Sequence, residues 1–237
     1  MNFVPPLVSG QLIARYKRFL FDAILHDGRE ITGSCPNTGS MAGLTAPGSR
    51  IWMSVHSTEK RKYAHAWQMI EADGTIVGIN ASFANKIAEE AWQSGRLSFL
   101  SGYTTIERER KYGRNSRIDF LFSADGLPPA YVEVKNVHFM REPGLAEFPD
   151  TKTIRGAKHL EELGDMAEAG ARAIMLYVVQ RGDCDRVKLC RDLDPNYCAA
   201  FDRAISRGVE AYAINCRLTP EEITADRLIP VDEPGID

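Results

Sequence analysis

Two short apolar runs separated by a turn form the clearest pattern in this chain. They cover residues 117–122 and 131–137, and both are rich in β-branched and aromatic side chains, as strands usually are. Residues 123–129, between them, contain Asp, Gly and two Pro residues, which favour a turn. The pattern therefore predicts a β-hairpin.

Charged side chains interrupt this hairpin at alternate positions. Side chains alternate across a strand with period two, so Glu133 and Lys135 share one face and the valines beside them share the other. Asp119 lies between two apolar residues of the first strand, so we expect it to point away from them and towards the same polar face. The alternative is a solvated hairpin face, because Glu-x-Lys triplets are common in proteins.

These three side chains suit metal chemistry. Two carboxylates match a hard cation such as Mg²⁺, which prefers oxygen ligands and keeps several waters. A lysine beside them can position a water molecule or stabilise negative charge that develops on a phosphate. We therefore interpret Asp119, Glu133 and Lys135 as a candidate catalytic group.

The first third of the chain has strand-like patterns. Asp-Gly steps after residues 26 and 72 signal hairpins. Five short strands within about eighty residues favour a small closed barrel of the OB type, and a β-sandwich is the competing architecture. The predicted strands cover residues 12–25, 30–35, 50–54, 64–71 and 76–79.

The remainder of the chain mixes helical and strand-like patterns. Asn85 is a candidate N-cap and Gly95 a candidate C-terminal residue for a first helix. The predicted order is helix, three strands, helix, strand, helix, strand, which favours a mixed sheet flanked by helices. We predict two domains, at residues 1–82 and 83–237. The predicted helices cover 85–95, 151–169 and 196–206, and the additional strands cover 103–110, 173–180 and 209–216.

Composition limits the classes of function. The chain has 237 residues and a net charge of −3, so any nucleic-acid binding must come from local basic patches. Residues 1–82 contain 8 Lys and Arg against 6 Asp and Glu, whereas the rest is acidic. The five cysteines are odd in number and include no Cys-x-x-Cys pair, which argues against a disulfide framework or a zinc site. With no signal peptide and no membrane-spanning apolar run, we expect a reducing, cytoplasmic setting.

Basic residues cluster at three places where they could contact a nucleic-acid backbone. Two clusters lie in the first domain with aromatic residues interleaved, a combination that can follow phosphates and stack bases. The third lies on the second predicted helix. The alternatives are an ordinary barrel exterior and an exposed helix face with a Lys158–Glu162 pair. The predicted DNA contacts are Arg15, Lys17, Arg18, Lys60, Arg61, Lys62, Arg155, Lys158 and His159.

Residues 35–41, Cys-Pro-Asn-Thr-Gly-Ser-Met, are dense in turn formers. One interpretation is a tight loop with an Asn or Gly at positive φ. The other is a loop whose backbone amides approach a ligand or a phosphate.

The element order of the second domain, with an Asp on one strand and Glu-x-Lys on the next, resembles the PD-(D/E)xK nucleases. The usual Pro-Asp pair is replaced here by Ile118-Asp119. The resemblance implies Mg²⁺ or Mn²⁺ held by Asp119, Glu133 and the Val134 carbonyl, with Lys135 at the attacking water. It also implies catalytic roles for the residues that match the helix glutamate and the strand-end polar helper. These are Glu90, with Glu89 as its neighbouring alternative, and Gln180.

A closer match extends over nearly the whole chain. The chain resembles the sugar fermentation stimulation protein (SfsA) family, which implies an OB-like first domain, a nuclease-like second domain, and DNA binding without marked sequence preference. It also implies a regulatory link to maltose metabolism in bacteria. The matching segments are residues 15–20, 35–41, 60–63, 111–113, 116–120, 132–137, 148–150 and 155–160.

Two functions compete at this point. One is a metal-dependent DNA endonuclease, and the other is a non-catalytic DNA-binding regulator on a nuclease-like scaffold. A third interpretation is a small-molecule sensor that uses the loop at residues 35–41. We expect DNA as the partner and no membrane association, and the oligomeric state stays open, with a homodimer as one option.

Overall fold

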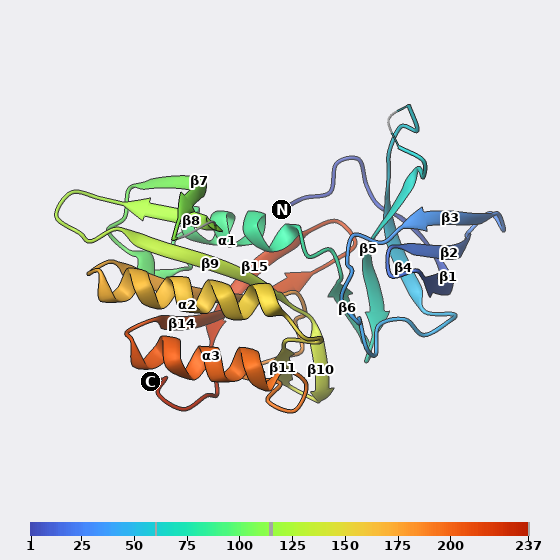
Figure 1. Ribbon diagram of the computed structural model, residues 1–237. Helices are drawn as coiled ribbons and strands as arrows, with labels where there is room; N and C mark the ends of the chain where they lie inside the picture. Colours follow the sequence, from blue (N-terminus) through green and yellow to red (C-terminus); the bar gives the residue numbers. More distant parts are fainter. Residues whose placement is uncertain (60, 114–115, 237) are drawn as a thin grey trace.

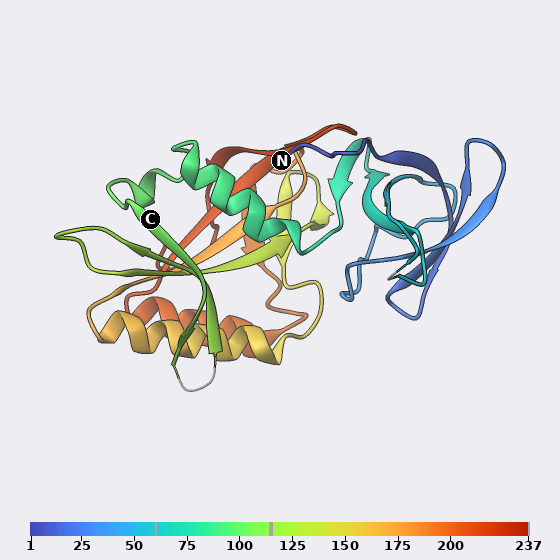
Figure 2. The same cartoon turned by 90° about the horizontal axis from the view of Figure 1, so that it is seen from above.

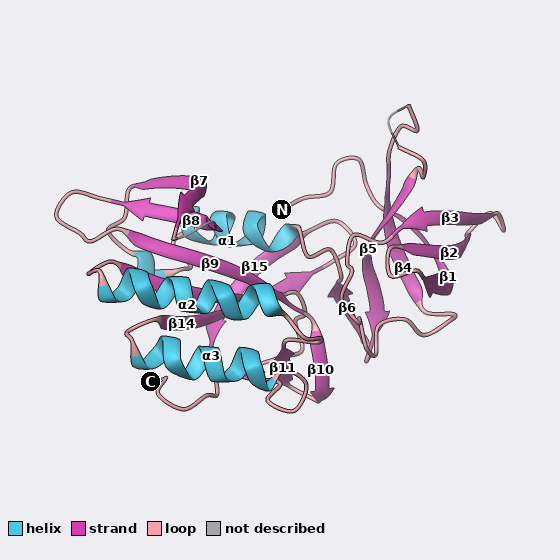
Figure 3. Ribbon diagram, in the orientation of Figure 1, coloured by secondary structure: helices cyan, strands magenta, loops and turns pink. Residues whose placement is uncertain are grey.

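The computed structural model consists of a β-barrel beside a larger α/β body (Figure 1). It describes residues 1–59, 61–113 and 116–236. The larger body has a mixed sheet with helices on its two faces (Figure 3). The predicted fold class is therefore confirmed. Within the described residues, no helix is both long and apolar enough to cross a membrane.

The barrel is one closed sheet in the order β3-β2-β1-β4-β5-β6. A bridge between Ser34 and Ala66 joins β3 to β5 and closes it, which excludes the sandwich alternative. Its core is built around Trp67 and Phe21, neither of which is exposed. The strands are β1 (Val8–Tyr16), β2 (Leu20–Leu25), β3 (Glu30–Ser34), β4 (Arg50–Val55), β5 (His65–Ala72) and β6 (Thr75–Gly78).

The strand predicted over residues 12–25 is instead a hairpin. Lys17 and Arg18 have φ angles of 52° and 66°, and this left-handed pair reverses the chain between β1 and β2. Two consecutive residues with positive φ suit the twist of a tight hairpin. The prediction failed because neither residue is the Gly or Asn that usually marks such a turn. Lys17 and Arg18 therefore lie at an exposed tip and not on opposite faces of a strand.

The large sheet runs in the order β15-β14-β12-β9-β8-β7. The pairs β9–β12 and β12–β14 are parallel and the others are antiparallel, so the sheet is mixed. Three further short strands form a small separate sheet. The strands are β7 (Thr105–Tyr112), β8 (Ser116–Ser123), β9 (Ala130–Val137), β10 (Phe139–Glu142), β11 (Leu145–Phe148), β12 (Arg172–Val179), β13 (Arg186–Leu189), β14 (Glu210–Leu218) and β15 (Ile223–Ile229).

Helices cover both faces of the large sheet (Figure 2). Helix α1 (Phe83–Gln93) packs over one face, and α2 (Ile154–Glu168) and α3 (Pro195–Ser206) pack together over the other. A short 3₁₀ turn (Ser98–Leu100) follows α1. Because both faces are covered, each strand of the central sheet contributes to two apolar cores.

The start of α1 differs from the prediction. The helix begins two residues earlier, with Ser82 at the N-cap position, and Asn85 lies inside the first turn. Asn80 precedes the helix and accepts hydrogen bonds from the Ser82 backbone and hydroxyl groups. Asn85 is therefore free for another contact, described below. Gly95, with φ of 73°, follows the helix as predicted.

Polar contacts fix the barrel against the larger body. Arg181, which is 1% exposed, pairs with Asp73 on the β5–β6 turn at 2.9 Å and with Asp183 at 2.7 Å. Gly78 of β6 donates its backbone N–H to the carbonyl of Gln180. The barrel therefore lies close to the end of β9, where the charged residues of the hairpin occur.

Candidate active site

Asp119 lies where strands β8 and β9 stop pairing. The last paired residues of the two strands on this side are Phe120 and Val132. Beyond that point, the Asp119 carboxylate takes the place of a strand partner, because Oδ2 accepts the Val134 backbone N–H at 2.8 Å. Its Oδ1 accepts from the Asn85 amide of α1, also at 2.8 Å. Both oxygens are thus oriented by fixed donors.

The strand changes direction at Asp119. The β7–β8 register passes from Phe120 to Ile118 without pairing Asp119, and Glu109 opposite has a φ of 54°. Ile118 packs in the core on the α2 side, whereas Phe120 packs in the core on the α1 side. Residues two apart in a regular strand would share one face. This local twist allows Asp119 to reach both Val134 and Asn85.

Glu133 is nearly inaccessible, at 3% exposure. Its Oε1 accepts from Lys135 Nζ at 2.6 Å and contacts the ring Nδ1 of His159 on α2. Its Oε2 is buried and has no hydrogen-bond partner. The face that carries Glu133 and Lys135 is therefore covered by α2, which contradicts the alternative of a solvated hairpin face.

The two carboxyl groups have opposite pKa shifts. Burial, with a further contribution from the charge of Glu133, raises the pKa of Asp119. Burial acts in the same direction on Glu133, but the hydrogen bond from His159 and the charge of Lys135 outweigh it and lower the pKa of Glu133. The negative charge of Glu133 therefore disfavours a second negative charge on Asp119. A bound cation would stabilise both carboxylates in their ionised form.

The residues present fit a divalent cation. Glu133 Oε2 is an unused buried acceptor, and Asp119 lies near enough for its charge to interact with that of Glu133. The N–H and C=O groups of one strand residue point to the same side, so the Val134 carbonyl faces the gap that holds Asp119. Among the described residues, no three His, Cys, Asp or Glu side chains gather as a metal cluster. The donor set is two carboxylates and one carbonyl, which leaves positions for water and suits Mg²⁺ or Mn²⁺.

His159 has a different place from the one predicted. It was expected to contact DNA, but it is 4% exposed and its Nδ1 faces Glu133. Its Nε2 lies 3.2 Å from Arg155 Nε and acts as the acceptor, so the proton on Nδ1 is the one that faces the carboxylate. His159 is therefore a positioning residue for Glu133.

Basic residues line a polar hollow of about 360 Å³ beside this group. The structure brings together Arg155 and Lys158, which were predicted, with Arg117 and the acidic Glu109, which were not. Lys158 Nζ also lies 3.5 Å from Glu162 Oε1, but Glu162 is buried, so this is not the surface pair of the alternative interpretation. His159 lines the same hollow and links it to Glu133.

Two predicted catalytic positions lie elsewhere. Glu90 pairs with the N-terminal ammonium group at 2.7 Å, and Glu89 pairs with Arg108. The helix residue that contacts Asp119 is Asn85, one turn earlier. In the described part of the chain, neither glutamate contacts Asp119 or Glu133, and the catalytic role of Glu90 stays a prediction.

Gln180 also lies away from the acids. It is fully buried, and its amide donates to the Asn80 carbonyl at 2.9 Å and to the Asn136 side chain. These contacts place it at the junction between the barrel and β9. These contacts link the two parts of the chain, and the catalytic role of Gln180 stays a prediction.

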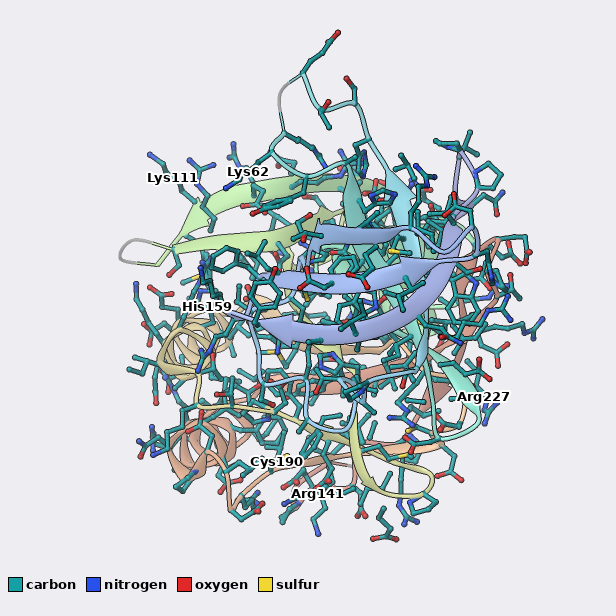
Figure 4. The ribbon with its side chains drawn as sticks, turned by 90° about the vertical axis from the view of Figure 1, so that its right-hand side faces the viewer. Lys62, Lys111, Arg141, His159, Cys190 and Arg227 are labelled. Carbon is teal, nitrogen blue, oxygen red and sulfur yellow. The ribbon has the colours of Figure 1, made fainter. Side chains whose placement is uncertain are left out.

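The basic residues of the barrel differ in their availability. Arg15 donates to the carbonyls of Arg18, Asn37, Gly39 and Ser40, which corrects its prediction as a phosphate contact. The side chains predicted beside it remain exposed, and Lys60 lies outside the described residues. In Figure 4, Lys62, Lys111 of β7 and His159 lie towards the same edge of the view. Of the described basic residues predicted as DNA contacts in the barrel, the exposed ones are Lys17, Arg18, Arg61 and Lys62.

The loop at residues 35–41 is held by the chain itself. Its residue at positive φ is Met41, with a φ of 52°, and not the predicted Asn or Gly. The Met41 N–H donates to the Asp150 carboxylate at 3.1 Å, and the Ser40 hydroxyl donates to the Asp150 carbonyl at 2.9 Å. Burial would raise the pKa of Asp150, but the hydrogen bond and charge of His138, aided by these loop donors, lower it. The amide of Met41 is therefore already used by a carboxylate of the protein.

Comparison with known proteins identifies relatives along most of the chain. A family model described as the sugar fermentation stimulation protein RE domain matches residues 82–222, and one described as the SfsA N-terminal OB domain matches residues 13–79. The second match confirms the predicted OB-like barrel, whereas the boundary at residue 82 stays a prediction.

Whole-length relatives give the same result. A sugar fermentation stimulation protein homolog from Agrobacterium fabrum is 65% identical over 233 residues, which is 98% of each chain. One from Rhizobium meliloti is 63% identical over 234 residues, covering 99% of this chain and 98% of the other. The solved structure of Pyrococcus furiosus SfsA in complex with Ca²⁺ has a TM-score of 0.88 and 25% identity, with 98% of each chain covered.

Proposed function

This chain belongs to the sugar fermentation stimulation protein (SfsA) family, and from that premise we propose that it binds DNA and hydrolyses its phosphodiester bonds with Mg²⁺ or Mn²⁺. The observation that carries the proposal is the unpartnered, buried Oε2 of Glu133, in a group that also holds Asp119 and Lys135. A carboxylate oxygen without a donor is costly in a protein interior, and a bound cation removes that cost. The Ca²⁺ in the related P. furiosus structure supports an oxygen-rich cation site.

Each residue of the group has a defined task. Asp119, Glu133 and the Val134 carbonyl would hold the ion, which would lower the pKa of an attacking water and neutralise charge on the scissile phosphate. Asn85 and the Val134 N–H orient Asp119, and His159 orients Glu133. Lys135 carries its ammonium group next to Glu133, where it can orient the attacking water and stabilise charge on the pentavalent phosphorus.

Exposed basic residues supply the surface for DNA. Arg117, Arg155 and Lys158 line the polar hollow next to Glu133, so a strand held there would place a phosphate near the acids. The turn at Lys17 and Arg18 and the exposed Arg61 and Lys62 add positive charge on the barrel. Contacts of this kind bind phosphates and carry no base information, which agrees with sequence-independent binding.

A second candidate is a DNA-binding regulator of sugar metabolism that does not cleave. The description of the relatives as sugar fermentation stimulation proteins favours it. Incubating labelled duplex, single-stranded and branched DNA with the protein and Mn²⁺ separates the two candidates. We expect cleavage of at least one substrate that disappears with EDTA. Intact DNA in every lane, at protein concentrations that saturate binding, would leave the regulator as the better account.

A further inference from the structure

A second hollow, of about 390 Å³, lies where the barrel meets the start of α1. Its lining comes from the barrel strands, from the segment that leads into α1, and from Phe3. Its volume falls in the range of small-ligand sites, about 300–1,000 Å³. None of its side chains takes part in the hydrolysis described above.

Two phenylalanines give the hollow an aromatic wall. Phe3 and Phe83 are both half-buried, with ring centroids 5.9 Å apart and planes tilted by 55°. Both line the hollow. Partly accessible rings of this kind provide a stacking surface for a flat aromatic ligand.

A row of polar groups with fixed orientations lines the same hollow. Ser82 donates to Asn80 at 2.6 Å, Asn80 donates to Gln68 at 2.7 Å, and Gln68 donates to Ser54 at 2.7 Å. The Ser54 hydroxyl in turn lies 2.7 Å from His56 Nε2. Asn80 and Gln68 are 5% and 4% exposed, so their amides cannot reorient freely. The Asn80 amide donates one hydrogen bond, to Gln68. Its second hydrogen has no acceptor among residues 1–59, 61–113 and 116–236, so it can donate to a ligand.

The charge of the hollow favours an anion. No Asp or Glu lines it, whereas Arg61 does, and the described residues offer Arg61 no ion pair. Burial, together with the charge of Arg61, lowers the pKa of His56, so the imidazole is neutral at pH 7. A neutral hydrogen-bonding row, an aromatic wall and one cation match a nucleobase that carries a phosphate.

The hollow is close to the catalytic group. Asn80 lines the hollow and its carbonyl accepts from the Gln180 amide at 2.9 Å, and the same amide donates to the side chain of Asn136, which follows Lys135 on β9. Asn85 contacts Asp119 directly. A base bound in this hollow would therefore belong to a nucleotide close to the end of β9, on the strand whose phosphate lies at Asp119 and Glu133.

We propose that this hollow binds one unpaired nucleobase of the substrate strand, stacked on Phe3 and Phe83, with its phosphate on Arg61. A base inside an intact duplex cannot reach such a pocket without leaving the stack. The preferred substrate is therefore DNA with an unpaired nucleotide, such as a bulge or a single strand. This inference rests on the proposed function, because the strand held for hydrolysis supplies the base.

The test uses 2-aminopurine fluorescence in EDTA, so that neither metal nor cleavage contributes. We expect a duplex with one bulged 2-aminopurine to bind more tightly than the same duplex with that base paired, and with a larger fluorescence change. Phe83→Leu keeps the apolar packing but removes the ring, and it should weaken binding of the bulged duplex roughly 5- to 100-fold. Phe99→Leu is the matched control, since Phe99 stacks on Tyr212 beyond the other end of α1 and should change nothing.

Two further binding measurements complete the test. Arg61→Ala, at an exposed position, should also weaken the bulged duplex, while free 2-aminopurine mononucleotide should bind far more weakly than the bulge. Equal affinity for paired and bulged duplexes, no effect of Phe83→Leu, or a free mononucleotide that binds as tightly as the bulge would each overturn the inference. If the protein binds the base through Phe83 but does not cleave DNA in Mn²⁺, the base-binding inference holds and the nuclease proposal fails. If it cleaves DNA but does not bind the base, the nuclease proposal holds and the base-binding inference fails.

Discussion

Two polar clusters lie close to the junction of barrel and sheet, and they differ in whether the chain satisfies them. Around Asp150, the loop at residues 35–41 supplies the donors, and the pKa of that carboxyl is lowered. Around Glu133, one oxygen has donors from Lys135 and His159 and the other has none. In the first cluster the protein itself supplies donors to the Asp150 carboxylate, which fastens the loop to the larger body, and His138 Nε2 lies 3.5 Å from the same carboxylate. The second is incomplete, which is the property expected of a binding site.

The largest expected effect is on metal binding. Asp119→Ala removes one of two carboxylates, so the heat of Mn²⁺ binding measured by titration calorimetry should disappear. Asp150→Ala is the matched control, because its carboxylate is already occupied by loop donors, and it should bind Mn²⁺ like the wild type. Equal heats from both variants would place the metal somewhere other than the Glu133 cluster.

The next effect is on hydrolysis alone. Lys135→Ala should slow cleavage on the order of 10²- to 10³-fold, the usual cost of losing one preorganised charge or donor at a transition state. DNA affinity, measured in Ca²⁺, should change little, because one phosphate contact is a small share of the total. A variant that binds DNA far more weakly but cleaves bound DNA at the normal rate would make Lys135 a DNA contact.

The carboxyl groups of Asp150 and Asp119 should change the pH dependence of stability in opposite directions. The pKa of Asp150 is lowered in the folded protein, so its ionised form stabilises the fold above the usual aspartate pKa of about 3.9, and this stability is lost as the pH falls through the folded value. The pKa of Asp119 is raised, so its ionised form opposes folding at pH 7. In EDTA, raising the pH from about 3 to 7 should increase the thermal midpoint of the wild type relative to Asp150→Asn and decrease it relative to Asp119→Asn. Shifts of the same sign would contradict the contrast.

The smallest effect concerns the basic residues of the barrel. Lys17→Ala with Arg18→Ala should weaken binding of all DNA sequences alike and reduce the salt slope by about one unit for each lost phosphate contact. Arg15→Ala should instead lower the thermal midpoint, because Arg15 donates to four carbonyls of the neighbouring loops. An effect of the double variant on one sequence only would indicate base readout.

The sequence predicted what depends on local periodicity. Alternation along residues 131–137 placed Glu133 and Lys135 on one face, and the structure keeps them 2.6 Å apart. Two Asp-Gly steps marked hairpins correctly, at the β2–β3 and β5–β6 turns. The turn at Lys17 and Arg18 was missed because its residues carry no such signal.

The supporting residues of the site could not be predicted in the same way. Asn85 and His159 lie 34 and 26 residues away from the acids that they contact, on helices over opposite faces of the sheet. An Asn near the start of a helix is usually interpreted as an N-cap, so the sequence did not indicate that Asn85 contacts Asp119. His159 did carry a signal, since it lies next to Leu160 on the buried stripe of α2, where a polar residue needs a partner.

Glu133→Gln tests the central claim most directly, because it keeps the size of the side chain and removes the charge that the open oxygen offers. The measurement is the rate of DNA cleavage in Mn²⁺ for wild type and variant, at equal saturation with substrate. We predict cleavage by the wild type and a loss of at least about 10²-fold in the variant, which keeps its fold and its DNA affinity. A variant that cleaves at the wild-type rate would show that the unpartnered oxygen of Glu133 does not bind the metal.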